Sequence, residues 1–258
     1  NRQRMVDRRG LLSELDGVRR SLDSKVGQDM SNFQARAFET ILGGISEAFD
    51  LSKEDPRLVA RYDTAPLVNT NSIRKVWANH ERYRDHSQNI GKQMLLARRL
   101  CERGAGFVTV TTNFVWDMHA DKNNATVTEG MGYVGAPFDH AVATFIRDCE
   151  DRGLNEKILL VCCGEMGRNP VMNKNGGRDH WGRLAPLLFY GGGLKSGQVI
   201  GQSDRRGGEP ASTPILMENL TATLLHSLLD VNQVRVLDGL SNEVLDVVTG
   251  PRPIRELF

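Results

Sequence analysis

The stretch Lys157-Ile-Leu-Leu-Val-Cys-Cys163 decides the fold class, because it is a continuous apolar run that ends at Gly164. Runs of this length and composition are typical of strands that are covered on both faces of a parallel sheet. A second apolar run covers residues 184–190 and ends at consecutive glycines, after a long loop over residues 164–183. We therefore expect two neighbouring strands of one sheet, joined by a polar loop.

Working outward from this pair, the pattern continues to alternate between strand and helix. An amphipathic helix is predicted over residues 138–152, and the β-rich residues 107–112 predict an earlier strand, with an irregular glycine-rich stretch up to Pro137 between them. Downstream, Thr213-Pro214 has the cap-then-proline order that starts a helix. The predicted core face of that helix is Ile215, Leu220, Leu224, Leu225 and Leu228. This order predicts the α/β class, as an α/β/α sandwich around a mostly parallel sheet.

The first hundred residues are predicted to be helical, with apolar periodicity over roughly residues 11–22, 33–49 and 87–103. We divide the chain into a helical region, residues 1–104, which packs on the core or caps the site, and residues 105–258, the C-terminal portion of the α/β domain. Since the chain begins with Asn1 rather than Met, we expect an N-terminal piece to be missing. The lack of a secretory signal in the polar opening residues therefore carries no information about location.

Composition excludes several classes of protein. Hydrophobic residues make up 40% and charged residues 25%, which is typical of a globular chain with a sizeable core. The formal net charge of +1 gives no global attraction to nucleic acid, and no apolar run has the length of a transmembrane segment. The cysteines Cys101, Cys149, Cys162 and Cys163 lack metal-site spacing, so buried free thiols are favoured, with a strained disulfide between the adjacent pair as the alternative.

Polar residues follow the predicted strands, where ligands bind in open α/β sheets. Asp117 and His119 come after the first strand, Glu165 directly after the second, and His180 later in the same loop. Carboxylate and imidazole together favour zinc, manganese or iron over calcium. Three arginines in or beside the loop suit a tetrahedral oxyanion, namely Arg168, Arg178 and Arg183. The joint pattern predicts a divalent metal site with an anionic ligand.

Each of these residues also has a simpler interpretation. Asp117 and His119 would equally form a solvated loop pair, Glu165 would cap a turn, and His180 would be a hydrogen-bonded loop histidine. Arg168 would then only neutralise Glu165. Among the other histidines, His80 and His86 are predicted to lie at the surface, His140 to have at most an indirect role, and His226 to be structural.

Several motifs together resemble a known family. They are Trp116-Asp-Met-His119, Gly164-Glu-Met-Gly-Arg168, Gly177-Arg-Asp-His-Trp181, Gly191-Gly-Gly193 and Gly197-Gln-Val-Ile-Gly201. Over nearly its whole length the chain resembles a bacterial domain-of-unknown-function family described as sulfatase-like. Members look like relatives of alkaline phosphatases, sulfatases and cofactor-independent phosphoglycerate mutases. The resemblance implies an alkaline-phosphatase-like α/β/α sandwich, hydrolysis of a phosphate or sulfate ester, including glycan esters, and a site that often binds two metals.

The resemblance also implies roles for individual residues. Asp117 and His119 would serve one metal, Glu165 would replace an aspartate ligand, and His180 would be the late histidine ligand, with zinc or manganese as the expected ion. Members usually carry a twin-arginine export signal, which implies a periplasmic or exported protein. The family's nucleophile lies on an early strand, so it is expected outside this chain.

Three departures from the usual patterns bear on the function. Glu165-Met166 stands where the superfamily has Asp-His, the spacing from Asp117 to His119 is tighter than in the superfamily, and Asn169 stands where the family usually has threonine. The first two departures favour an alternative function. Methionine is a poor ligand for a hard or borderline ion. The alternative is a non-catalytic binding or cell-surface protein on a degenerate hydrolase fold.

Overall fold

The computed structural model describes residues 45–113 and 115–258. The chain forms two compact units, of which the first contains residues 1–61 and 92–111 and the second contains residues 62–91 and 112–258. The predicted helix at residues 11–22 lies outside the described residues, as does most of the predicted helix at 33–49. Within the described ranges, no helix is both long enough and apolar enough to cross a membrane.

The first unit contains short helices and the C-terminal half of a long one. Its described elements are α3 (Ser46–Ala48), the 3-10 helix η2 (Leu51–Lys53), α4 (Pro56–Arg61) and the end of α5 (His80–Glu102). The expected helix at 87–103 is thus confirmed, and it begins a further two turns upstream. Two buried arginines on α5, Arg98 and Arg99, bind Glu54 at 2.7 and 2.8 Å, which ties the segment around η2 to α5.

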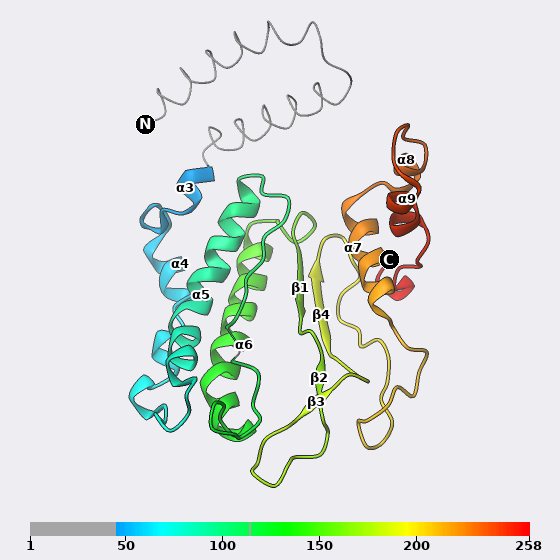
Figure 1. The fold of residues 1–258 in the computed structure, drawn as a ribbon. Helices are drawn as coiled ribbons and strands as arrows, with labels where there is room; N and C mark the ends of the chain where they lie inside the picture. The colour runs from blue at the N-terminus through cyan, green and yellow to red at the C-terminus, as the bar shows by residue number, and fades with distance from the viewer. Residues whose placement is uncertain (1–44, 114) are drawn as a thin grey trace, which may run out of the picture. The chain divides into compact units, whose positions relative to one another are not determined.

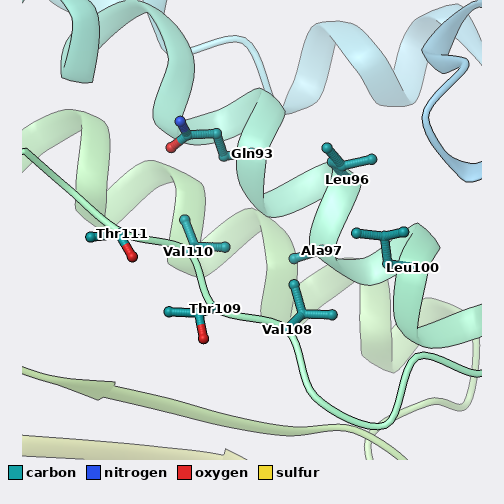
Figure 2. Close-up of a pocket in the computed structure, with 8 residues that line it drawn as sticks. All are labelled: Gln93, Leu96, Ala97, Leu100, Val108, Thr109, Val110 and Thr111. Atoms are coloured by element: carbon teal, nitrogen blue, oxygen red, sulfur yellow. The ribbon is translucent and has the colours of Figure 1, made fainter.

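The predicted strand at residues 107–112 is wrong, because these residues form no ladder within the described part of the chain. Their side chains nevertheless alternate between partly buried and exposed, as in a strand. Figure 2 shows Val108 and Val110 pointing toward α5 and Thr109 and Thr111 pointing away from it. Together with Leu96, Ala97 and Leu100 of α5, the two valines line a small pocket. The β-branched pattern therefore matches the alternation of the side chains, but it did not supply a pairing partner for a strand.

The second unit holds the sheets and the remaining helices (Figure 1). Its elements are η3 (Ala65–Leu67), η4 (Thr70–Ser72), the start of α5, α6 (Val127–Asp151), β1 (Leu159–Cys163), β2 (Gly167–Arg168), β3 (His180–Trp181), β4 (Leu187–Gly191), α7 (Met217–Leu228), α8 (Val231–Arg235), α9 (Asn242–Thr249) and η5 (Arg255–Leu257).

Both sheets of this unit are two-stranded and antiparallel. β1 pairs with β4, with Val161 opposite Phe189, and β2 pairs with β3, with Arg168 opposite His180 (Figure 1). The two apolar strands were predicted correctly, but a mostly parallel sheet is not found among the described residues. The reason is the connection, since a parallel pair needs a crossover, usually a helix, whereas residues 164–186 form a loop that carries the β2–β3 ribbon. The chain is therefore mixed α/β with small antiparallel sheets.

Helix α6 begins eleven residues before the predicted start at Phe138. Thr126 caps it by accepting a hydrogen bond from the backbone N–H of Glu129 at 3.2 Å. Gly130 lies within the helix because the side chain of Met118 packs where a Cβ would be. Pro137 is buried inside the same helix. Glycine and proline normally indicate a break, and tertiary packing overrides that preference here.

The predicted start of α7 is also wrong. The helix begins at Met217 rather than at Thr213-Pro214, and its N-cap is Leu216. Of the predicted core face, Leu220 is buried while Ile215 and Leu228 are exposed. All four cysteines are free thiols, as predicted, but the predicted burial holds only for Cys149, since Cys101 and Cys162 are partly buried and Cys163 is exposed.

A cluster of buried side chains in the second unit fixes the loop that carries the candidate site. It consists of Val68, Ile73, Tyr83, Val115, Met118, Ala125, Tyr133 and Val134. The rings of Tyr83 and Tyr133 lie 5.6 Å apart, and the Tyr83 hydroxyl accepts a hydrogen bond from the Ala125 N–H at 3.0 Å. Because the side chain of Met118 is part of this core, the loop around it is held firmly from inside.

Candidate metal centre

Asp117 and His119 flank the core residue Met118. Two backbone hydrogen bonds here each join residues that are two positions apart. The Met118 N–H donates to the Trp116 carbonyl at 3.1 Å, and the His119 N–H donates to the Asp117 carbonyl at 3.0 Å. The backbone is therefore tightly turned at this point. While the Met118 side chain enters the core, the side chains on either side of it remain only partly buried.

Trp116 anchors the start of this turn. Its ring meets Phe138 edge-on at 5.3 Å and His86 edge-on at 6.1 Å. His86, predicted to lie at the surface, is only 5% exposed, and its Nε2 lies 3.2 Å from the carbonyl of Val134. Burial lowers the pKa of His86. The charged residues beside His86 in the sequence indicated a surface position. His86 lies within α5, and its own side chain is buried although its neighbours are charged.

The β2–β3 ribbon brings His180 to the same place. Arg168 and His180 are direct cross-strand partners, so their side chains lie on the same face of the ribbon. His180 Nε2 lies 3.0 Å from Asp117 Oδ1. His119 Nε2 lies 3.0 Å from both of those atoms. Three potential ligand atoms therefore form a triangle with equal sides.

This triangle has the size of a metal coordination site. Ligand atoms bound to zinc at about 2.0–2.2 Å are separated from one another by roughly 3–3.5 Å. The group Asp117, His119 and His180 is one in which a metal ion could be held, with its ligand atoms all within 4.8 Å of one another. The donor set, one carboxylate oxygen and two imidazole nitrogens, suits zinc, manganese or iron.

Arg168 lies against the same triangle. Its Nη2 donates to Asp117 Oδ1 at 2.6 Å, and its Nη1 lies 3.4 Å from His119 Nε2. Partial burial would raise the pKa of Asp117, but the hydrogen bonds from His180 and Arg168 outweigh it and hold that pKa below its usual value. Asp117 is therefore a charged carboxylate at neutral pH, as a metal ligand must be.

The other predicted site residues lie elsewhere. Glu165 is exposed in the turn between β1 and β2 and is not part of the triangle. The guanidinium of Arg178 donates a hydrogen bond to the Asn169 carbonyl at 2.8 Å. Arg183 has a side chain that is 68% exposed and lies 3.5 Å from Glu209. Of the three predicted anion-binding arginines, Arg168 is therefore the one that faces the triangle.

Sequence reasoning missed two residues that contact the site. Asp179 Oδ1 lies 3.1 Å from His119 Nδ1, and Asn173 donates to the His119 carbonyl at 3.0 Å. The hydrogen bond with His119 is the main interaction that lowers the pKa of Asp179. Asp179 belongs to the motif Gly177-Arg-Asp-His-Trp181, so the sequence does show a carboxylate next to His180. Its contact with His119 depends on how two distant segments pack, which the sequence does not show.

Comparison with known proteins gives a family and no function. The model of a family described as a protein of unknown function (DUF1501) matches residues 1–258, so the chain belongs to this family. No significant match was found among curated proteins or among solved structures.

Proposed function

For this member of the DUF1501 family, we propose a metal-dependent hydrolase that acts on a phosphate or sulfate ester and is exported. The proposal includes a relationship to the alkaline-phosphatase and sulfatase superfamily and its sandwich fold. The observation that carries it is the triangle of Asp117, His119 and His180 with Arg168 beside it.

The donor set supports catalysis better than a purely structural metal. Structural zinc sites are usually closed by four protein ligands, whereas catalytic sites use three and leave a position open. Asp117, His119 and His180 supply three, and they are partly exposed rather than sealed in the core. A bound divalent ion would supply Lewis acidity toward a non-bridging oxygen of the ester.

The chain's own residues would bind and orient the substrate. The guanidinium of Arg168 lies at the edge of the triangle, where its fork geometry matches a phosphate or sulfate group. Its positive charge would stabilise the negative charge that develops on the ester oxygens. No described residue is assigned as the attacking group.

Metal binding is tested by calorimetric titration of the purified protein with zinc and with manganese, after dialysis against chelator. We expect about one equivalent to bind, as three ligands and an open position imply. His180→Ala should lose most of this binding without unfolding. His226→Ala is the matched control, because His226 lies on α7 and contacts the ring of Phe258 rather than the triangle. Equal binding by wild type and His180→Ala would refute the proposed site.

A non-catalytic binding protein is the second candidate. The exposed position of Glu165, outside the triangle, favours it, because the superfamily often uses a second metal. Aryl phosphate and aryl sulfate substrates with the metal-loaded full-length protein distinguish the two. Turnover that disappears in Asp117→Asn supports the hydrolase, and stoichiometric metal without turnover supports the binding protein. Cell fractionation of the full-length protein tests export.

A further inference from the structure

The two ring nitrogens of His119 face different partners. Nε2 faces the triangle, 3.0 Å from His180 Nε2 and 3.0 Å from Asp117 Oδ1. Nδ1 faces away from the triangle, toward Asp179 Oδ1 at 3.1 Å. An ionised carboxylate only accepts hydrogen bonds, so the hydrogen bond with Asp179 requires a proton on Nδ1. The guanidinium of Arg168 only donates, and its Nη1 lies 3.4 Å from Nε2, so Nε2 is the acceptor there, while Asp117 Oδ1 accepts from His180. In a neutral imidazole the lone pair is then on Nε2, directed at the triangle.

Asp179 is held by its own set of contacts. Asn173 Nδ2 lies 3.3 Å from Asp179 Oδ1 and donates to the His119 carbonyl at 3.0 Å. The Asn173 side-chain oxygen accepts from the N–H groups of Asn175 at 3.0 Å and Gly177 at 2.9 Å. One amide side chain therefore closes the loop before β3 and joins it to both members of the Asp179–His119 pair.

The backbone fixes the same spacing independently. The N–H of Arg178 donates to the Met118 carbonyl at 2.9 Å, and the N–H of Asn169 donates to the Asp179 carbonyl at 2.8 Å. A Cβ at Gly177 would collide with the carbonyl of His119, so glycine permits this close approach of the two loops. The contacts of Gly177 and Arg178 with residues 118 and 119 therefore bring Asp179 to His119.

The Asp179–His119 pair is expected to contribute little to stability. Its loss should therefore change the orientation of the His119 ring without unfolding the protein. The Asp179 side chain is 59% exposed, and exposed ion pairs contribute little to stability. Metal-binding histidines usually donate their second nitrogen to a carboxylate or carbonyl, which fixes the ring and its tautomer. The contact of Asp179 with Nδ1 has this form.

We propose that Asp179 is a positioning residue that presents Nε2 of His119 to a divalent metal, and that Asn173 holds Asp179 in place. This inference rests on the proposed metal-binding function. Asp179 does not touch the metal or substrate itself and acts through His119.

The first test needs no metal. Long-range proton–nitrogen NMR spectra of the metal-free protein, recorded where imidazole is neutral, report the tautomer of each histidine. We expect His119 to carry its proton on Nδ1 in wild type and to shift toward the Nε2-protonated form in Asp179→Ala. Asn173→Ala should shift it in the same direction. Asp246→Ala, an exposed change on α9, is the control. An unchanged His119 tautomer in Asp179→Ala would overturn the inference.

The second test measures affinity for zinc. Loss of such an outer partner typically weakens metal binding about 10–100-fold, which we expect for Asp179→Ala but not for Asp246→Ala. The thermal unfolding midpoint should change little in either variant. If wild type binds no metal but the tautomer still shifts, the proposed function fails while the orienting role stands. If wild type binds zinc and Asp179→Ala binds it equally well, the positioning role fails alone.

Discussion

The carboxylate of Glu54 is predicted to make a large electrostatic contribution to stability in the first unit. Its Oε2 accepts from Arg98 at 2.7 Å and from Arg99 at 2.8 Å. The Arg98 side chain is 1% exposed, and its other guanidinium nitrogen binds Glu102. Arg99 also donates to the carbonyl of Ala48 at 2.8 Å. Glu54→Gln keeps the shape of the side chain and removes the charge between the two guanidinium groups.

The magnitude follows from the pKa of Glu54. Burial alone would raise this pKa, but the hydrogen bonds from Arg98 and Arg99 outweigh burial and lower it from 4.5 to about 2. Each unit of difference between the folded and unfolded pKa is equivalent to about 1.4 kcal/mol, so the charge contributes roughly 3 kcal/mol at neutral pH. Removing one partner of a buried ion pair costs about 3–5 kcal/mol, which agrees in size.

The sign of the pH dependence is fixed by the direction of the shift. Because the folded pKa is the lower one, the stabilisation is complete above 4.5 and is lost as the pH falls toward 2. Urea unfolding of wild type and Glu54→Gln should therefore differ by roughly 3 kcal/mol at neutral pH, and the difference should shrink through this acid range.

The matched control is Glu81→Gln. Glu81 forms an exposed ion pair with Arg84 at 3.3 Å, so this change should cost less than about 1 kcal/mol at any pH. A Glu54→Gln variant that is as stable as this control, or whose deficit is the same at acid and neutral pH, would refute the reasoning.

Three further results are expected. Gly177→Ala should weaken zinc binding in calorimetric titration, because its new methyl group collides with a backbone carbonyl of the site loop, whereas Gly182→Ala, which meets open space, should not. Burial lowers the pKa of His86 below 6.5, so stability should fall as the pH drops below that value, and urea unfolding of His86→Phe should show a flatter profile. Arg168→Gln should weaken inorganic phosphate binding to the zinc-loaded protein about tenfold, whereas Arg183→Gln, at an exposed position, should not.

The sequence by itself determined the local features of this protein. Apolar runs identified β1 and β4, and helical periodicity identified α5 and the second half of α6. These features depend on neighbouring residues, which a linear pattern contains. Polar residues after the predicted strands also indicated Asp117 and His180, which the structure brings to 3.0 Å, although the predicted strand before Asp117 does not form.

Only the tertiary structure decided what depends on contacts between distant segments. The antiparallel direction of β1 and β4 depends on how the loop between them returns, which apolar runs do not encode. Glycine at position 130 within α6 is explained by Met118, a side chain from another segment that occupies the place of a Cβ. In the same way, Glu165 lies outside the triangle and Asp179 lies against His119, because backbone contacts between the two loops, rather than spacing along the chain, set which side chains meet.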